Sequence, residues 1–165
     1  DVRFITVTLN AIDVSIAKKI YRYVDYKNII YTDVDAAEIL LDKQIEGIER
    51  AVKMGFTIKI NSVLIPGIND FHIKDISEKV KKLGVYLFNV MPMIPAKKSY
   101  FEKIGVKGAE RKDVANITKG IEGINIMKHC RQCRSDALGL LDDDLSGRII
   151  TQEEDSKCKC KKMGF

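Results

Sequence analysis

The sequence predicts an α/β protein in which parallel strands have flanking helices. Three β-rich apolar runs occupy residues 4–9, 56–65 and 85–90, and segments with helical periodicity separate them. Strands that are joined through helices pair in parallel, with right-handed crossovers. Three strands make an incomplete sheet with exposed edges, so we expect further βα units upstream, as in a barrel.

A helix should follow the first strand. Asp13 can cap its beginning, and Ile16, Ile20 and Val24 recur every four residues, as on one helix face. We interpret the tyrosine-rich stretch at 21–31 as an irregular connection.

A long helix is expected from about Asp35 to Met54. Asp35 and Glu38 stand three residues apart, which fits a capping box, and Gly55 follows as the residue that ends the helix. The predicted buried face consists of Ala37, Leu41, Ile45, Ile48 and Val52.

The second strand, at 56–65, leads through a Pro-Gly turn at 66–70 into another helix, which Gly84 ends. The apolar positions of this helix are Ile73, Ile76, Val80 and Leu83. We expect the third strand to be broken by Met91 and Pro92.

After the third strand the pattern weakens into a loop. A further helix is predicted near residues 110–119. Residues 142–165 are mostly polar and mixed in charge, so we expect a flexible tail there.

Composition favours a globular protein of the cytoplasm. The chain has 165 residues, of which 45% are hydrophobic and 31% charged. No apolar run approaches the roughly 20 residues that span a bilayer, and we expect no signal peptide. The net charge of +5 is scattered, so we expect neither nucleic acid nor membrane as a partner. Because the chain begins at Asp1 without Met, we interpret it as a fragment or processed product.

All four cysteines stand late in the chain, as the pairs Cys130/Cys133 and Cys158/Cys160. This distribution favours metal or redox chemistry over structural disulfides. The two thiolates of the first pair can reach one metal or one iron–sulfur cluster, although a zinc half-site and a redox dithiol are alternatives. One pair supplies only two ligands, and residues 1–128 contain no Cys and a single His. The remaining ligands must come from elsewhere.

Other candidate ligands are less distinctive. Cys158 and Cys160 lie in the polar tail with a spacing that is unusual for cluster binding, so we interpret them as incidental thiols. His129 adjoins the first pair and could be a ligand or have a structural role. We expect His72, at the start of a helix, to lie on the surface.

Polar residues also gather where the predicted strands end. In parallel α/β folds this rim hosts ligands. A buried amide without a partner costs about 1–3 kcal/mol, so these side chains should bind either a ligand or nearby backbone. The residues are Thr8 and Asn10 at the end of the first strand, Asn61 and Ser62 late in the second, and Asn89, Met91 and Pro92 following the third.

Four stretches together resemble successive blocks of the NifB family of radical S-adenosylmethionine (SAM) enzymes, which act in nitrogenase cofactor biosynthesis. They are VTLNA at 7–11, NSVLIPGIND at 61–70, NVMP at 89–92 and HCRQCRSDALGLL at 129–141. The segment 36–55 is also similar. The resemblance covers about residues 4–141, and HCRQCR is its most distinctive part. The CxxxCxxC loop of the family is absent from the chain.

The resemblance implies a portion of a partial (βα)6 radical SAM barrel. Residues 1–128 would be the carboxy-terminal half of the barrel, and residues 129–141 a cysteine motif for an iron–sulfur cluster. The implied reaction fuses two [4Fe–4S] units, with carbide insertion, into an 8Fe precursor of the iron–molybdenum cofactor. The implied cofactors are [4Fe–4S] clusters and SAM, and the expected partners are cluster carrier proteins and the missing amino-terminal half of the barrel.

The resemblance also suggests roles for particular residues. Cys130 and Cys133 would hold a substrate cluster. Asn10, Asn61 and Ser62 would contact the ribose or amino-acid part of SAM, and Met91 would lie near the adenine. No catalytic residue is assigned, and the chain alone would be inactive.

Two alternative functions are open. Radical SAM enzymes of the molybdenum cofactor type have a strand and turn similar to residues 61–70. A small non-enzymatic scaffold could instead bind zinc through the cysteine pairs.

Overall fold

The computed structural model describes residues 3–127, 139–140 and 143–144. The chain divides into two compact units, Asp1–Lys128 and His129–Phe165. In the second unit, β7 (Gly139–Leu140) pairs antiparallel with β8 (Asp143–Asp144). Most of the predicted cluster motif at 129–141, including both of its cysteines, and most of the predicted tail lie outside the described residues.

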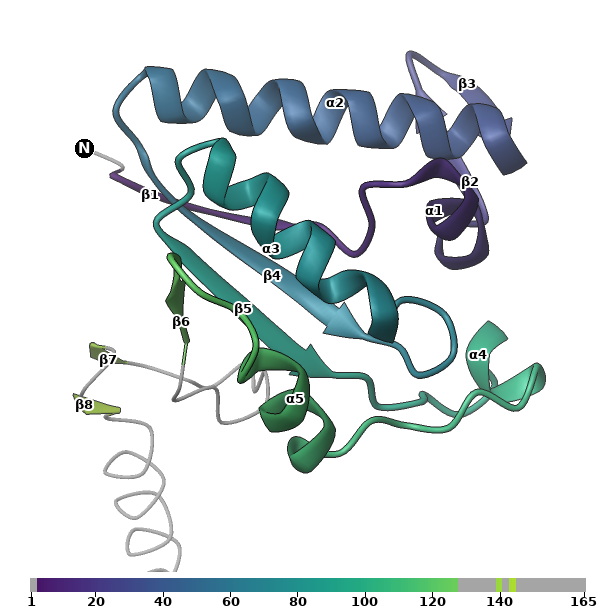
Figure 1. Cartoon of the computed structure of the whole chain (residues 1–165). Coiled ribbons are helices and arrows are strands. Elements are labelled where there is room, and N and C mark those ends of the chain that lie inside the picture. Colours follow the sequence, from purple (N-terminus) through teal and green to yellow (C-terminus); the bar gives the residue numbers. More distant parts are fainter. Residues whose placement is uncertain (1–2, 128–138, 141–142, 145–165) are drawn as a thin grey trace, which may run out of the picture. The chain divides into compact units, whose positions relative to one another are not determined.

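The first unit contains a parallel sheet of four strands in the order β1-β4-β5-β6. The strands are β1 (Phe4–Thr8), β4 (Thr57–Leu64), β5 (Leu87–Pro92) and β6 (Asn125–Ile126). The connecting helices α2 (Asp33–Lys53), α3 (Ile73–Lys82) and α5 (Arg111–Thr118) lie over the same face of the sheet (Figure 1). The predicted α/β class with parallel strands is therefore confirmed, whereas closure into a barrel stays a prediction.

Strand β4 shows how the sheet acquires two different faces. Its burial alternates with the period of two that a strand imposes on its side chains. Ile58, Ile60 and Leu64 are almost fully buried, and with Phe88 of β5 they form the core against α2 and α3. Burial of each such side chain stabilises the fold by about 1.5–3 kcal/mol. The intervening residues of β4 lie on the opposite side of the sheet, which we call the open face. These residues are Thr57, Lys59, Asn61 and Val63.

The ends of three helices follow the sequence closely. Asp13 caps α1 (Val14–Ile20), because its carboxylate accepts hydrogen bonds from the backbone amides of Ser15, at 2.8 Å, and Ile16, at 3.3 Å. The hydrogen bond from the Ser15 hydroxyl is the main reason that the pKa of Asp13 is lowered. Gly55 and Gly84 follow α2 and α3 with φ values of 82°, in the left-handed region that suits glycine.

The stretch that we interpreted as irregular is a β-hairpin. Strands β2 (Tyr23–Tyr26) and β3 (Ile29–Thr32) pair antiparallel around Lys27 and Asn28, whose φ values are 55° and 63°. Positive φ at both central residues is the mark of a two-residue turn of type I′. Val24 therefore lies in β2, and its assignment to the helix face was wrong. The alternation of aromatic and β-branched residues outweighed one coincidental four-residue spacing.

Two boundaries also differ from the prediction. Helix α2 begins at Asp33, and its N-cap Thr32 makes no side-chain hydrogen bond, so the capping box at Asp35 was wrong. Strand β5 continues through Met91 and Pro92, which pair with Val63 and Leu64 of β4. Pro92 is tolerated because it is the last residue of the strand.

Two short elements after the third strand have no clear signal in the sequence. These are β6, of two residues, and α4 (Tyr100–Lys103). The predicted helix near 110–119 is confirmed as α5, and Glu110 is its N-cap. No helix among the described residues is long and apolar enough to cross a membrane.

Candidate functional site

A row of polar side chains crosses the open face near the carboxyl ends of the strands. Thr8 of β1, Asn61 of β4 and Asn89 of β5 are in register. The Asn89 side-chain amide donates to the Asn61 carbonyl oxygen at 2.9 Å, which fixes both side chains on one face. Asn89 is buried, Asn61 half-buried and Thr8 exposed. No described residue accepts a hydrogen bond from the Asn61 amide nitrogen.

Met91 belongs to the same face. It pairs with Val63 one step beyond the polar row, and both side chains are half-buried. The structure thus brings two of the predicted ligand-binding residues, Asn61 and Met91, onto one surface. Their contact with a ligand stays a prediction.

Ser62 points to the other side of β4. Its side chain is fully buried in the layer between sheet and helices, and its hydroxyl donates a hydrogen bond to the Leu9 carbonyl oxygen. This hydrogen bond joins the end of β1 to β4 on the side of the sheet that faces the helices. The structure therefore does not place the Ser62 side chain beside that of Asn61.

Asn10 lies just beyond β1 and is only 8% exposed. Its side-chain carbonyl oxygen accepts a hydrogen bond from the Val63 amide at 2.8 Å. This is the backbone contact that we had considered as the alternative to a ligand. The side chain holds the β1 end against β4 at the rim of the open face.

The sequence analysis assigned Asn69 only to a turn, but it joins three segments at this rim. It is fully buried, and its oxygen accepts from the Ile65 amide at 2.7 Å. Its nitrogen donates to the carbonyl oxygens of Asn10 and Val63, both at 2.9 Å. Asn69 therefore fixes the β4–α3 turn over the end of β1. A turn asparagine next to Pro-Gly was the available signal, but it did not reveal these long-range contacts.

His72, which we expected on the surface, is 6% exposed, so that expectation was wrong. It ends the short 3-10 helix η1 (Asp70–His72), which turns its side chain inward. Its Nε2 accepts from the Ile12 amide at 3.2 Å, and its Nδ1 lies 2.9 Å from an Asp75 carboxylate oxygen. These partners suit the tautomer with its proton on Nδ1. His72 therefore links the β1–α1 connection to α3.

Tyr21 and Gln44 form a further polar pair that the sequence did not reveal. Gln44 donates to the Thr8 carbonyl oxygen at 2.7 Å. Burial raises the pKa of the Tyr21 hydroxyl; Asn10 and Gln44 oppose this shift but do not reach regular hydrogen-bond geometry. Within the described residues, the Tyr21 hydroxyl and the Gln44 side-chain oxygen are buried without partners. Such groups beside a strand end are candidates for contact with water or a ligand.

A groove of about 740 Å³ lies at the same end of the strands, but away from the polar row. It is lined by Lys18 and Lys19 of α1, by Asp33 and Tyr100, by the β4–α3 turn and by residues 104–107. Neither Asn61 nor Asn89 nor Met91 contributes to it. The open face is thus a separate surface.

Cys130, Cys133 and the adjacent His129 lie outside the described residues, as do Cys158 and Cys160. Within the described part of the chain, no three His, Cys, Asp or Glu side chains are grouped as a metal site would need. Cluster ligation by Cys130 and Cys133 stays a prediction.

Comparison with known proteins gives a consistent result. The chain is 39% identical over 156 residues to the FeMo cofactor biosynthesis protein NifB of Herbaspirillum seropedicae, covering 93% of the chain and 30% of that protein. It is 42% identical over 147 residues to NifB of Sinorhizobium fredii, covering 87% and 30%. For NifB of Azotobacter vinelandii the values are 37% over 143 residues, 85% and 28%. No protein-family model matches.

The chain therefore spans less than a third of the length of these curated relatives. Over most of its own length it is similar to part of the proteins named NifB, as the sequence motifs indicated.

Proposed function

We propose that this chain contributes to FeMo cofactor biosynthesis, as part of an enzyme that acts as its NifB relatives do. The observation that carries the proposal is the identity of 37–42% with NifB proteins over most of the chain. The fold supports it, because the parallel sheet leaves one face free of its own helices and places polar side chains there.

The finer proposal is a radical SAM enzyme that joins two [4Fe–4S] units into an 8Fe precursor. The iron–sulfur units are the substrate, and cluster carrier proteins would deliver them. Cys130 and Cys133 would hold one unit through their thiolates, which are the usual protein ligands of such clusters. The remaining cluster ligands would come from a segment outside this chain.

The residues on the open face suit a nucleoside cofactor such as SAM. Thr8, Asn61 and Asn89 offer neutral hydroxyl and amide groups, which can pair with ribose hydroxyls and base edges. The thioether of Met91 supplies an apolar, polarizable contact at the next register position. When bound to a reduced cluster, SAM would supply a radical and a one-carbon unit.

The role of this chain would be to bind and orient. Asn61 has an amide nitrogen without a partner in the described structure, so it is the strongest candidate for direct contact. Asn10 and Ser62, which bind backbone groups, would keep the strand ends in place. Helices on the other face exclude water from beneath the sheet.

The experiment is anaerobic reconstitution of the 165-residue chain with iron, sulfide and an excess of a small thiol, which can supply the cluster ligands that the two cysteines do not, followed by gel filtration to remove unbound iron. We expect the wild-type chain to bind iron with the broad visible absorption of an iron–sulfur cluster. The double variant Cys130→Ser/Cys133→Ser should lose both the iron and the absorption. The matched variant Cys158→Ser/Cys160→Ser removes the same number of thiols and should retain them.

Two results would contradict the proposal. Unchanged iron content in the Cys130→Ser/Cys133→Ser variant would show that these two thiolates are not ligands of the cluster. A colourless chain that binds zinc through all four cysteines would instead favour the scaffold alternative.

A further inference from the structure

The groove beside α1 and the β4–α3 turn combines apolar side chains with lysines. It has a volume of about 740 Å³, and every residue that lines it belongs to the first unit. Its apolar lining residues are Pro66, Ile68, Tyr100, Ile104 and Val106. The charged residues among the described ones that line it are three lysines and one carboxylate, namely Lys18, Lys19, Lys107 and Asp33.

Residues 100–107, which contribute much of this lining, are fixed to the core of the unit. Phe101 and Val106 pack against the core, and the Val106 amide donates a hydrogen bond to the Phe101 carbonyl oxygen at 2.9 Å. Tyr100, by contrast, is 39% exposed, and the Arg22 guanidinium lies 4.5 Å from the centre of its ring. The segment therefore presents a preformed apolar surface with a cation beside it.

The positive charges of the groove are poorly compensated within the protein. Lys18 lies 4.0 Å from an Asp33 carboxylate oxygen, but both side chains are exposed, so the pair contributes little. Lys19 and Lys107 form no ion pair with any described residue. The groove consequently has a positive potential, which a negatively charged partner would neutralise.

A small anion such as phosphate is a poor match for this groove. Such ions bind where unused backbone amides converge. The amides of Gly67, Ile68, Gly105 and Val106 all donate hydrogen bonds within the protein. A small anion would therefore meet only exposed lysines, and it would leave the apolar lining uncovered. A ligand that carries both carboxylates and apolar groups uses the whole surface.

We infer that the groove docks an acidic segment of a partner protein, in which carboxylate side chains are interspersed with apolar ones. The apolar side chains pack against Tyr100 and Ile104, which are both partly exposed. The carboxylates pair with Lys19 and Lys107 and orient the segment. This inference goes beyond the proposed function and does not depend on it, because the groove contains none of the predicted cluster ligands or SAM-binding residues.

The test measures binding of a fluorescein-labelled peptide to the 165-residue chain by fluorescence anisotropy. In this acidic peptide, two leucines are spaced among glutamates and serines. One control peptide has glutamines in place of the glutamates, and another has serines in place of the leucines. We expect the acidic peptide to bind and its affinity to fall with added salt. Each control peptide should bind more weakly, because it lacks one of the two kinds of contact.

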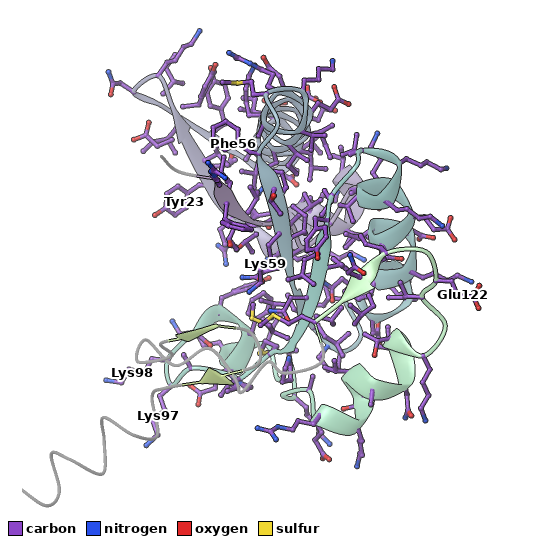
Figure 2. The ribbon with its side chains drawn as sticks, turned by 90° about the vertical axis from the view of Figure 1, so that its left-hand side faces the viewer. Tyr23, Phe56, Lys59, Lys97, Lys98 and Glu122 are labelled. Carbon is purple, nitrogen blue, oxygen red and sulfur yellow. The ribbon has the colours of Figure 1, made fainter. Side chains whose placement is uncertain are left out.

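Substitution of two lysines tests the charges of the groove. Lys19→Ala/Lys107→Ala should weaken binding of the acidic peptide about fivefold, the scale of two exposed charge contacts. Lys82→Ala/Lys97→Ala is the matched control, because it also removes one lysine from the last turn of a helix and one from a loop. Neither control residue lines the groove, and Figure 2 shows Lys97 projecting outward from the loop between β5 and α4. This control should bind like the parent.

A second pair of variants tests the apolar contact. Ile104→Ser removes a partly exposed apolar side chain from the groove, and Ile94→Ser removes one that is exposed but does not line it. We expect an affinity loss of about threefold for Ile104→Ser, the scale of part of one buried side chain. Ile94→Ser should leave the affinity unchanged. Melting temperatures show that each variant is folded.

Several outcomes would overturn the inference. Equal affinity of the two double-lysine variants for the acidic peptide would show that the groove is not the binding surface. Equal binding of the acidic and the glutamine peptides would show that charge has no role, and absence of binding at low salt would remove the interaction itself. Displacement of the peptide by inorganic phosphate or by oligothymidylate, at an ionic strength where sodium chloride does not displace it, would assign the groove to phosphate groups instead.

Discussion

At the scale of single residues, Asn69 shows how one amide positions the candidate site. It binds the preceding strand β4 through Val63 and the turn after it through Ile65, and it binds the segment just beyond β1 through the Asn10 carbonyl oxygen. Asn10 in turn accepts a hydrogen bond from Val63. The two asparagines therefore fix the relative position of the strand ends that form the rim. Neither role depends on a bound ligand.

Truncation of Asn69 should consequently destabilise the fold. Asn69→Ala leaves one amide and two carbonyl groups without their partner in a buried place, so we expect a loss of about 2–4 kcal/mol in the free energy of unfolding. Urea denaturation followed by circular dichroism measures it. Asn116→Ala, at an exposed position of α5, is the control and should change stability little. Equal midpoints for the two variants would show that the contacts of Asn69 contribute nothing.

The sequence predicted some site residues and missed others for a physical reason. Strand alternation is local, so the position of Asn61 near the end of a strand could be predicted from the apolar residues around it. The contacts of His72 and Asn69 join residues about 60 positions apart, from Ile12 to His72 and from Asn10 to Asn69. Such contacts follow from how the turns pack, and periodicity carries no information on that packing.

At the scale of elements, the hairpin β2–β3 is the main departure from prediction. Apolar spacing identified α2, α3 and β4, because each is long enough for several repeats of its period. The strands of the hairpin have four residues each, and its turn lacks glycine. A short strand offers only two alternations, and these are compatible with one helical turn.

Two substitutions of Asn28 in the turn should have opposite effects on the stability of the hairpin. Asn28 has a φ of 63°, which asparagine and glycine tolerate but a β-branched residue does not. Asn28→Val should therefore weaken the hairpin by about 1–2 kcal/mol, the cost of left-handed backbone for such residues. Asn28→Gly should be neutral or slightly stabilising. Amide hydrogen exchange of residues 29–32 reports the local change, and equal protection in the two variants would contradict the turn assignment.

At the scale of the whole molecule, the sheet of the first unit is open at β1. This strand pairs only with β4 among the described residues, and Phe4 at its start is 75% exposed. The Thr8 carbonyl oxygen, on the unpaired side, is bound by Gln44 instead of a neighbouring strand. The sequence predicted this incompleteness from strand count alone, although it counted three strands where the sheet has four.

If another strand completes the sheet in a longer protein, the amides of β1 should report it. The Leu9 amide bonds to β4, and in a parallel ladder alternate residues face the same neighbour, so Ile5 and Val7 should do likewise. Thr6 and Thr8 then direct their amides to the open edge. In the 165-residue chain we expect fast hydrogen exchange at Thr6 and Thr8 and slow exchange at Ile5 and Val7, measured by NMR.

In a chimera in which this chain replaces the matching segment of the Azotobacter vinelandii relative, all four amides should exchange slowly, because the match covers only 28% of the relative and its remaining sequence can supply a pairing strand. Ile5 and Val7 serve as internal controls, since their protection should be the same in both proteins. The isolated chain should also self-associate with rising concentration, because an unpaired edge strand accepts a second copy. Fast exchange at Thr6 and Thr8 in the chimera would mean that β1 is a true edge. The open face would then not be enclosed as a barrel requires.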